Sequence, residues 1–125
     1  MDGLIKSMAV SASGMQAQAA RLRHVSENIA NADTPGFRRK ITTFDADPSG
    51  RVDLGPVHLD RTALPRIYDP NHPLADATGF HEGSNVDLVI EIADAREAQR
   101  SYEANLKLFD QGRQMTQALF ELLRR

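Results

Sequence analysis

Apolar residues recur with a helical period near the start of the chain. From Leu4 to about Ala32 there is no proline, and every seventh position is apolar at Met8, Met15, Leu22 and Ile29. Residues seven apart lie on one face of a helix, so the pattern predicts a helix with an apolar stripe. Asn31 and Asp33 interrupt the pattern, and Thr34 precedes a proline, which predicts the end of the helix.

A second helical pattern runs from Val86 to Leu123 without a proline. One heptad phase contains Leu88, Ala95, Tyr102, Phe109, Thr116 and Leu123, and the phase four residues later contains Ile92, Leu106 and Phe120. Ser84 or Asn85 is expected to cap the start of this helix. Asp87 and Glu91 then fall where the helix dipole favours anions, and Arg124 and Arg125 where it favours cations.

Residues 37–85, between the helices, hold five of the six prolines, so this segment is not expected to be helical. Residues 39–44 and 51–59 are rich in β-compatible side chains, and the turn sequence of residues 47–50 separates them. This arrangement predicts a short β-hairpin. Residues 65–73 contain three of these prolines and predict an extended return with little regular structure.

These patterns predict a mainly α fold in which the two terminal helices pack as a coiled-coil pair. We expect three segments: residues 1–36 with the first helix and its turn, residues 37–85 with the β-hairpin and an extended stretch, and residues 86–125 with the second helix. The two helices are expected to share one core. Both also carry apolar residues outside their main stripes, such as Ala9 and Ile90, so assembly with other subunits and self-sufficient folding both remain open.

Composition removes several classes of function. Fifteen Lys and Arg residues against seventeen Asp and Glu give a net charge of −2, without the basic excess of a general nucleic-acid binder. The absence of cysteine excludes disulfides, cysteine nucleophiles and Cys-containing zinc sites. No segment has the roughly 20 apolar residues of a membrane span. Residues 1–10 do not resemble a signal peptide, and we expect no direct membrane insertion.

Candidate catalytic residues are sparse. His72 and His81 lie near Asp69 and Asp76, but their spacing matches no metal or hydrolase motif, and the dispersed glycines form no phosphate-binding loop. We therefore expect no enzyme activity, no cofactor and no metal. A small hydrolase that uses one of these histidines is the alternative from another class, and a soluble coiled-coil adaptor is a third.

Three blocks of sequence form longer motifs. The first block covers residues 28–38 and places a helix end before a Thr-Pro-Gly-aromatic-basic turn, through Asn28, Asn31, Asp33, Thr34, Pro35, Gly36 and Phe37. The second block consists of Asn85, Val86, Asp87, Tyr102 and Asn105, and the third of Tyr68, Asp69, Pro70, His72, Pro73, Gly79 and Phe80. The first two blocks resemble the N- and C-terminal signatures of the flagellar basal-body rod and hook family, and the third is typical of one of its proximal rod members.

The resemblance implies a structural subunit of the proximal rod that assembles helically with other axial proteins and copies of itself. It also implies transit through the flagellar type III export apparatus without a cleaved signal peptide, and a location in the rod that spans the periplasm. Under this reading the third block makes subunit contacts, and the helix seam consists of Met8, Met15, Leu22, Ile29, Leu88, Ile92, Tyr102, Leu106 and Phe109. A sister proximal rod protein is the nearest alternative within the family.

In the first block, single residues have readable roles. Asn31 is expected to end the helix in a left-handed conformation, and Pro35 prevents the helix from continuing. Gly36 permits a sharp change of direction, and Phe37 supplies an apolar anchor for the departing chain.

Overall fold

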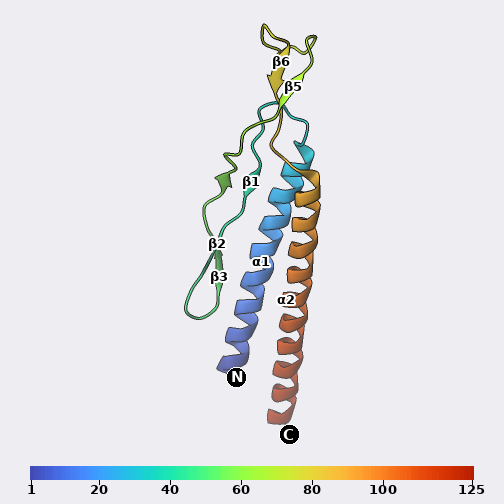
Figure 1. Cartoon of the computed structure of the whole chain (residues 1–125). Helices are drawn as coiled ribbons and strands as arrows, with labels where there is room; N and C mark the ends of the chain where they lie inside the picture. The colour runs from blue at the N-terminus through green and yellow to red at the C-terminus, as the bar shows by residue number, and fades with distance from the viewer.

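The chain forms a long hairpin of two helices with a thin β arm beside it. The computed structural model describes all 125 residues, with α1 at Asp2–Ala30 and α2 at Leu88–Leu123. The two helices run antiparallel along most of their length, and both chain termini lie at the same end (Figure 1). The prediction of a mainly α fold built on two packed terminal helices is confirmed.

Small residues form much of the contact between α1 and α2. A Cβ added at Gly14 would lie 2.8 Å from the side-chain amide of Asn105, and one added at Gly112 would lie 2.7 Å from Cγ of Met8. Ala98 of α2 is completely buried. The backbones approach closely because these positions carry little or no side chain.

The predicted seam is therefore wrong for part of its members. Ile29, Leu88, Ile92 and Leu106 are 39%, 48%, 48% and 47% exposed, so they are not enclosed between the helices of one chain. Met8 contacts α2, and the remaining four, Met15, Leu22, Tyr102 and Phe109, are half-buried. The buried positions of α2 follow another heptad phase, through Glu91, Ala98 and Gly112. A contribution of the exposed residues to contacts between subunits stays a prediction.

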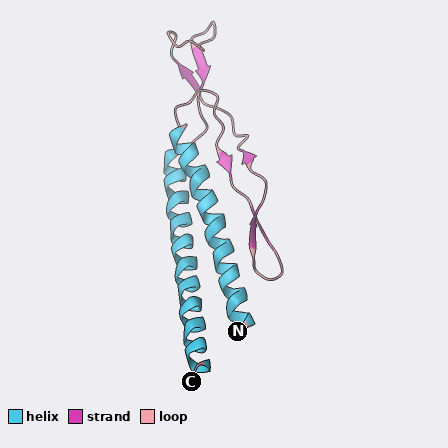
Figure 2. Ribbon diagram, turned by 180° about the vertical axis from the view of Figure 1, so that it is seen from behind, coloured by secondary structure: helices cyan, strands magenta, loops and turns pink.

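The β arm runs beside α1 as a long antiparallel hairpin (Figures 1 and 2). β1 (Lys40–Ile41) pairs with β4 (His58–Leu59), and β2 (Phe44–Ala46) pairs with β3 (Val52–Leu54). Asp47 closes the turn, since its Oδ1 accepts hydrogen bonds from the backbone N–H groups of Ser49 and Arg51 at 2.9 and 3.0 Å. The predicted hairpin is confirmed.

Two side-chain contacts hold the arm against α1. The Ser13 hydroxyl oxygen accepts a hydrogen bond from the Val52 N–H at 3.0 Å, and His24 Nδ1 lies 2.7 Å from the Thr42 hydroxyl. Burial and the neighbouring cations Arg23 and Lys40 lower the pKa of His24. The lowered pKa favours the neutral imidazole.

A second hairpin stands at the end of the molecule opposite the termini. β5 (Arg66–Tyr68) pairs antiparallel with β6 (Phe80–Glu82), although the proline-rich stretch was expected to have little regular structure. The prolines at positions 65, 70 and 73 flank β5 or lie in the following loop. They therefore block none of its ladder hydrogen bonds, which explains the difference.

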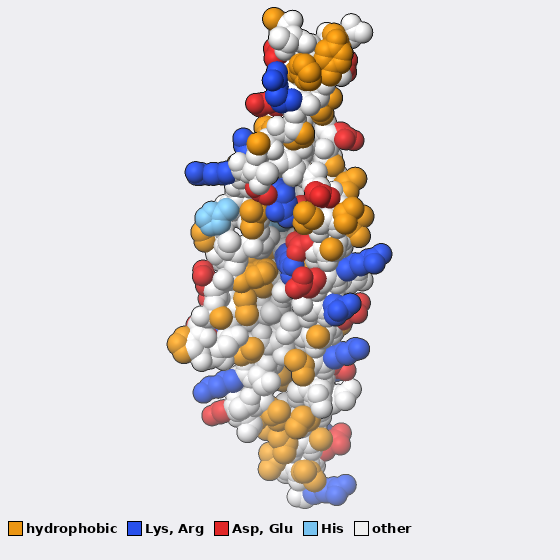
Figure 3. Space-filling model, in the orientation of Figure 1, with side chains coloured by type: hydrophobic (Ala, Val, Ile, Leu, Met, Phe, Trp, Pro, Cys, Tyr) orange, Lys and Arg blue, Asp and Glu red, His pale blue; other side chains and the backbone are white.

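The hydrophobic core of the single chain is thin. Its buried apolar residues are Ala17, Ala20, Val25 and Ala98, and all are small or medium in size. Many larger apolar side chains along α2 are exposed, and apolar atoms gather over the helices in Figure 3. Exposed apolar surface of this extent marks sites of contact with other molecules.

Neither α1 nor α2 contains a stretch that is long and apolar enough to span a membrane.

Candidate functional site

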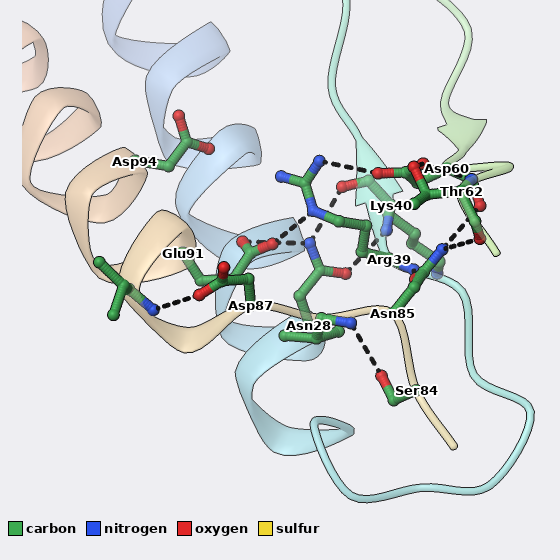
Figure 4. Close-up of polar contacts among 12 residues, drawn as sticks. Asn28, Arg39, Lys40, Asp60, Thr62, Ser84, Asn85, Asp87, Glu91 and Asp94 are labelled. Atoms are coloured by element: carbon green, nitrogen blue, oxygen red, sulfur yellow. Dashed lines mark hydrogen bonds and ion pairs between the residues drawn. The ribbon is translucent and has the colours of Figure 1, made fainter. Parts of the chain in front are cut away.

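Polar side chains from distant parts of the chain meet where α1 ends, α2 begins and β1 departs (Figure 4). We call this cluster the polar junction and define it by Asn28, Arg39, Asp60, Asn85 and Glu91. The first and second signature blocks both contribute to it, through Asn28 and Asn85. Its geometry therefore shows what those blocks do.

Asn28 joins the last turn of α1 to β1. Its Oδ1 accepts a hydrogen bond from the Lys40 N–H at 2.8 Å, and its Nδ2 donates to the Lys40 carbonyl at 3.0 Å. The side-chain amide thus pairs with both backbone groups of one residue, as a neighbouring strand would. Because Asn28 is only 1% exposed, water cannot replace these bonds. Asn28 therefore fixes the position of the departing chain relative to α1.

Glu91 is the charged centre of the junction and is 0% exposed. Its Oε1 accepts a hydrogen bond from Arg39 Nε at 2.7 Å, and its Oε2 accepts one from Asn28 Nδ2 at 3.3 Å. A buried carboxylate is tolerated when it is paired and hydrogen-bonded in this way. Burial alone lowers the pKa of Arg39, but its hydrogen bonds to Glu91 and Asp60 outweigh burial and raise it.

Asn85 connects the start of the second signature to the arm. Its Oδ1 accepts a hydrogen bond from the Arg39 N–H at 2.7 Å, and its Nδ2 donates to the carbonyls of Asp60 and Thr62 at 2.9 and 3.2 Å. Asp60 in turn accepts from the Thr62 hydroxyl and N–H, and these bonds lower the pKa of Asp60. Asn85 therefore links the arm to the segment that leads into α2.

The cap of α2 differs from the predicted one. Asp87, and neither Ser84 nor Asn85, is the N-cap, since its carboxylate accepts a hydrogen bond from the Val89 N–H at 3.0 Å. The Ser84 hydroxyl oxygen accepts a hydrogen bond from the Val86 N–H, before the helix begins. The Asn85 Oδ1 accepts one from the Arg39 N–H. The prediction placed the helix start two residues too early, because both residue types also cap helices.

The turn after α1 also differs in detail from its predicted form. Asn31 caps the helix with φ of −109°, so the expected left-handed conformation is wrong. Its Nδ2 donates to the Glu27 carbonyl at 2.8 Å, and its Oδ1 accepts from the Thr34 hydroxyl at 3.1 Å. Gly36, with φ of +75°, makes the sharp change of direction.

The backbone of this turn contacts the segment that precedes α2. The Gly36 N–H donates to the Gly83 carbonyl at 3.2 Å, and the Asn85 N–H donates to the Phe37 carbonyl at 3.3 Å. Phe37 and Pro35 are half-buried, whereas Asp33 and Thr34 are exposed. The two signatures, almost fifty residues apart, are thus hydrogen-bonded to each other at one end of the helix pair.

Further ion pairs extend along the helices from the junction. Arg21 of α1 pairs with Asp94 of α2 and lies 3.3 Å from Glu97. The hydrogen bond that Arg21 donates to Asp94 is the main reason that the pKa of Arg21 is raised. Asn105 of the C-terminal signature lies farther along α2, against Gly14. This signature thus contributes to helix packing as well as to the junction.

Sequence reasoning missed three residues of this region. Glu91 was expected only to interact with the helix dipole, and neither Arg39 nor Gly14 was assigned a contact. A signal for Gly14 and Gly112 was available, since glycine inside a helix costs about 1 kcal/mol relative to alanine. A glycine in the middle of a predicted helix therefore indicates that another element packs closely against it. Nothing in the sequence near Glu91 indicated that it is buried.

The third block forms a knob at the tip of the molecule, made by β5, β6 and the loop between them. Tyr68 and Phe80 pack with ring centroids 5.1 Å apart, and the Arg66 guanidinium lies 4.8 Å from the Phe80 centroid. Gly79, with φ of +87°, lies against the Tyr68 ring. Asp69 accepts a hydrogen bond at its carbonyl from the His72 N–H at 3.0 Å. Tyr68 is exposed, as are Pro70 and Pro73, so the knob presents these side chains outward.

Asp76 organises the loop of the knob. Its Oδ1 accepts hydrogen bonds from the Thr78 hydroxyl, the Thr78 N–H and the Phe80 N–H, and its Oδ2 lies 3.2 Å from Arg66. The Thr78 hydroxyl contributes most, followed by the Phe80 N–H, and together these groups lower the pKa of Asp76 to about 2.

This shift gives the knob a defined dependence on pH. A depressed pKa means that Asp76 stabilises the knob above its ordinary pKa of 3.8, and that this contribution is lost as the pH falls toward 2. We expect the amide NMR signals of Thr78 and Phe80 to move together with a midpoint near pH 2. An Asp76→Asn variant should lack that transition, and a midpoint near pH 3.8 would show that these hydrogen bonds are not formed.

The two histidines of the hydrolase alternative lie in the knob, but in another arrangement. The rings of His72 and His81 stack with centroids 3.9 Å apart, and His72 Nδ1 accepts a hydrogen bond from the Leu74 N–H at 3.1 Å. No hydrogen bond joins either ring to a carboxylate. The structure contains no group of three or more His, Asp and Glu side chains placed to hold a metal ion.

Comparison with known protein families identifies both ends of the chain. The family described as "Flagella basal body rod protein" matches residues 8–38, and the one described as "Flagellar basal body rod FlgEFG protein C-terminal" matches residues 77–122. The first match ends at the turn after α1, and the second includes the start of α2. The two matched regions therefore meet at the polar junction.

Individual relatives match over nearly the whole chain. The flagellar basal-body rod protein FlgC of Agrobacterium fabrum is 43% identical over 136 residues, which cover 99% of this chain and 98% of that protein. FlgC of Aquifex aeolicus is 35% identical, with 97% and 98% covered, and FlgC of Salmonella typhimurium is 31% identical, with 86% and 88% covered. The chain therefore belongs to the flagellar basal-body rod protein family, among its FlgC members.

Proposed function

We propose that the chain is a structural subunit of the proximal rod of the bacterial flagellar basal body, where it transmits torque from the motor to the hook. Relatives named as rod proteins match it from end to end, which supports this function. The observation that carries the proposal is the polar junction, in which both family signatures hold the two helices and the arm together.

The junction suits a mechanical part. Its side chains satisfy one another while largely buried, and fully satisfied polar networks make a fold rigid and specific. Arg39 alone contacts a carboxylate from α2 and another from the arm. A load applied to the arm would therefore pass to α2 through Arg39 and to α1 through Asn28.

The exposed apolar residues supply surfaces for neighbouring subunits. Ile92, Leu106 and Leu119 lie on α2 and remain partly exposed, and the arm exposes Leu54 and Leu59. Each apolar side chain that a neighbour covers contributes about 1.5–3 kcal/mol when it is fully buried. Other rod subunits and copies of this chain would complete the thin core.

We propose further that the chain has no catalytic role. The histidines of the hydrolase alternative stack on each other instead of contacting a carboxylate, and the family members are named as rod proteins. A soluble coiled-coil adaptor would not require the two rod signatures or the full-length similarity to FlgC. The sister proximal rod protein FlgB is disfavoured because the relatives described above are FlgC proteins.

Export through the flagellar type III apparatus without a cleaved signal peptide, and a location in the periplasm-spanning rod, are parts of the same proposal. They rest on membership of the family. The thin core supports them, because a chain with only four buried apolar residues costs little free energy to unfold before export.

Leu106→Asp provides a test of the structural role. Leu106 is exposed in the single chain, so the variant should fold normally, yet a charge buried between subunits should prevent incorporation into the rod. We expect cells that lack the chain to be non-motile and to lack later axial structures. Leu106→Met should restore motility in these cells, and Leu106→Asp should not. Motile cells with complete basal bodies after deletion would refute the function.

A further inference from the structure

Two histidine rings stack inside the knob, at the end of the molecule opposite the termini (Figure 1). His72 lies in the loop after β5 and His81 lies in β6, so their contact joins the loop to the strand. The rings are nearly parallel, with an interplanar angle of 9° and centroids 3.9 Å apart. The charge on these two rings therefore bears on whether the loop stays closed on β6.

The hydrogen bond of His72 requires an uncharged ring. Its Nδ1 accepts from the Leu74 N–H at 3.1 Å, so the lone pair of this nitrogen faces a donor. A histidinium carries a hydrogen on both ring nitrogens and has no acceptor left. Protonation of His72 would break this bond and place two N–H groups against each other.

His81 is placed so that a positive charge on it is also unfavourable. Its Nδ1 is enclosed and has no hydrogen-bond partner. In a histidinium this nitrogen would be an enclosed N–H donor without an acceptor, which costs more than an unpaired acceptor on a neutral ring. Two cationic rings with centroids 3.9 Å apart would in addition repel each other.

The charged groups around the stack supply no counter-ion for it. Arg66 of β5, Glu82 of β6 and Asp76 of the loop line the same pocket as His81, and the turn after α1 adds no charged side chain to this pocket. Asp76 is already paired with Arg66 and hydrogen-bonded within the loop. Glu82 and Asp69, the first residue of the loop, are exposed. None of the ion pairs of the chain includes a histidine.

We propose that the stacked pair of His72 and His81 makes the knob sensitive to pH, with the loop closed on β6 while both rings are uncharged and released when they gain protons in moderate acid. Histidine is the side chain whose charge ordinarily changes between pH 5 and 8. Pro70 and Pro73, which the knob presents outward, would lose their fixed positions on release.

The release is expected to stop at Asp76. This residue has a pKa of about 2, so it keeps its hydrogen bonds to Thr78 and Phe80 in moderate acid. Residues 70–75 should therefore open while residues 76–80 stay in place. The inference concerns the single chain and does not depend on the proposed function.

Amide hydrogen exchange, measured by NMR on the full chain, tests the release at single residues. The Ala75 N–H donates to the His72 carbonyl at 3.0 Å in the segment that opens, and the Asp76 N–H donates to the Phe80 carbonyl at 2.8 Å in the part that stays. Protection is compared with the exchange rate of an unstructured peptide at the same pH. Between about pH 7.5 and about pH 5 we expect the protection of the Ala75 N–H to fall about tenfold, and that of the Asp76 N–H to change less than about twofold.

Substitutions in the stack separate its charge from its shape. Phenylalanine can stack in place of a histidine but cannot gain a proton, so His81→Phe removes the repulsion between the rings and leaves only the Leu74 bond sensitive to acid. The fall in protection at Ala75 should then be about threefold or less. The double variant His72→Phe/His81→Phe should show no fall.

His58→Phe is the matched control, because His58 is exposed in β4 and lies outside the knob. Its loss should leave the tenfold fall at Ala75 unchanged. Nuclear Overhauser contacts between the rings of Tyr68 and Phe80 report that each variant keeps the knob near neutral pH. An unchanged protection of Ala75 in the parent chain at about pH 5, or an equal fall in His81→Phe and the parent, would overturn the proposal.

Discussion

Arg39→Ala is expected to lower the free energy of unfolding of the chain by about 3 kcal/mol or more, the loss typical of breaking a buried ion pair. The substitution removes the only cation bonded to Glu91, and Glu91 is completely enclosed. It also removes the ion pair with Asp60, so the arm loses a link to α2. Chemical denaturation followed by circular dichroism measures the change.

Arg61→Ala is the control for this prediction. Arg61 is an exposed arginine without an ion pair in the same part of the chain, so its loss should change stability by no more than about 0.5 kcal/mol. In a double-mutant cycle, Arg39→Ala together with Glu91→Leu should cost less than the sum of the two single changes. Equal stabilities of the Arg39→Ala and Arg61→Ala variants would contradict the role given to the junction.

Gly14→Leu is expected to destabilise the helix pair by about 3 kcal/mol, the upper range for overpacking a contact. Even a Cβ at this position would lie 2.8 Å from the Asn105 amide, and the Asn105 Nδ2 already donates to the Ser101 carbonyl at 2.9 Å. A larger side chain must push α1 and α2 apart. Thermal unfolding and the helical signal of the purified variant measure the effect.

Gly3→Leu is the matched control for Gly14→Leu. No atom lies within 4 Å of a Cβ added at Gly3, which is also in α1, so the control should be neutral or slightly stabilising through its better helix propensity. Asn105→Ala should partly rescue Gly14→Leu, because it removes the side chain that the leucine meets. If Gly14→Leu leaves the stability unchanged while Asn105 is still present, the helices do not pack through Gly14.

Both helices could be predicted from the sequence because the pattern that indicates a helix is local. Long proline-free stretches with apolar residues at helical spacing predict helices whichever side of each helix makes the tertiary contacts. The same reasoning selected large apolar residues such as Leu106 for the helix contact, and the actual contact uses Gly14 and Ala98. In a protein whose large apolar residues face other subunits, size does not indicate which face is turned inward.

The polar junction could be predicted only in outline. The resemblance of residues 28–38 and 85–87 to family signatures marked the correct segments, but their meeting depends on the path of the intervening chain. Glu91 and Arg39 are ordinary surface residue types, and only the folded structure brings them within 2.7 Å. The residues of the knob were recognised, but its β-hairpin was not predicted, because prolines flank β5 and a proline-rich composition disfavours strands.

The central claim is that this chain is a rod subunit whose exposed apolar residues are covered by neighbouring subunits. Electron cryo-microscopy of basal bodies from cells that carry the chain, at a resolution that shows side chains, tests it most directly. We expect the chain in the proximal rod, with the polar junction intact and with Leu106 and Phe120 buried against adjacent subunits. A proximal rod that lacks the chain, or that contains it with these side chains facing solvent, would contradict the claim.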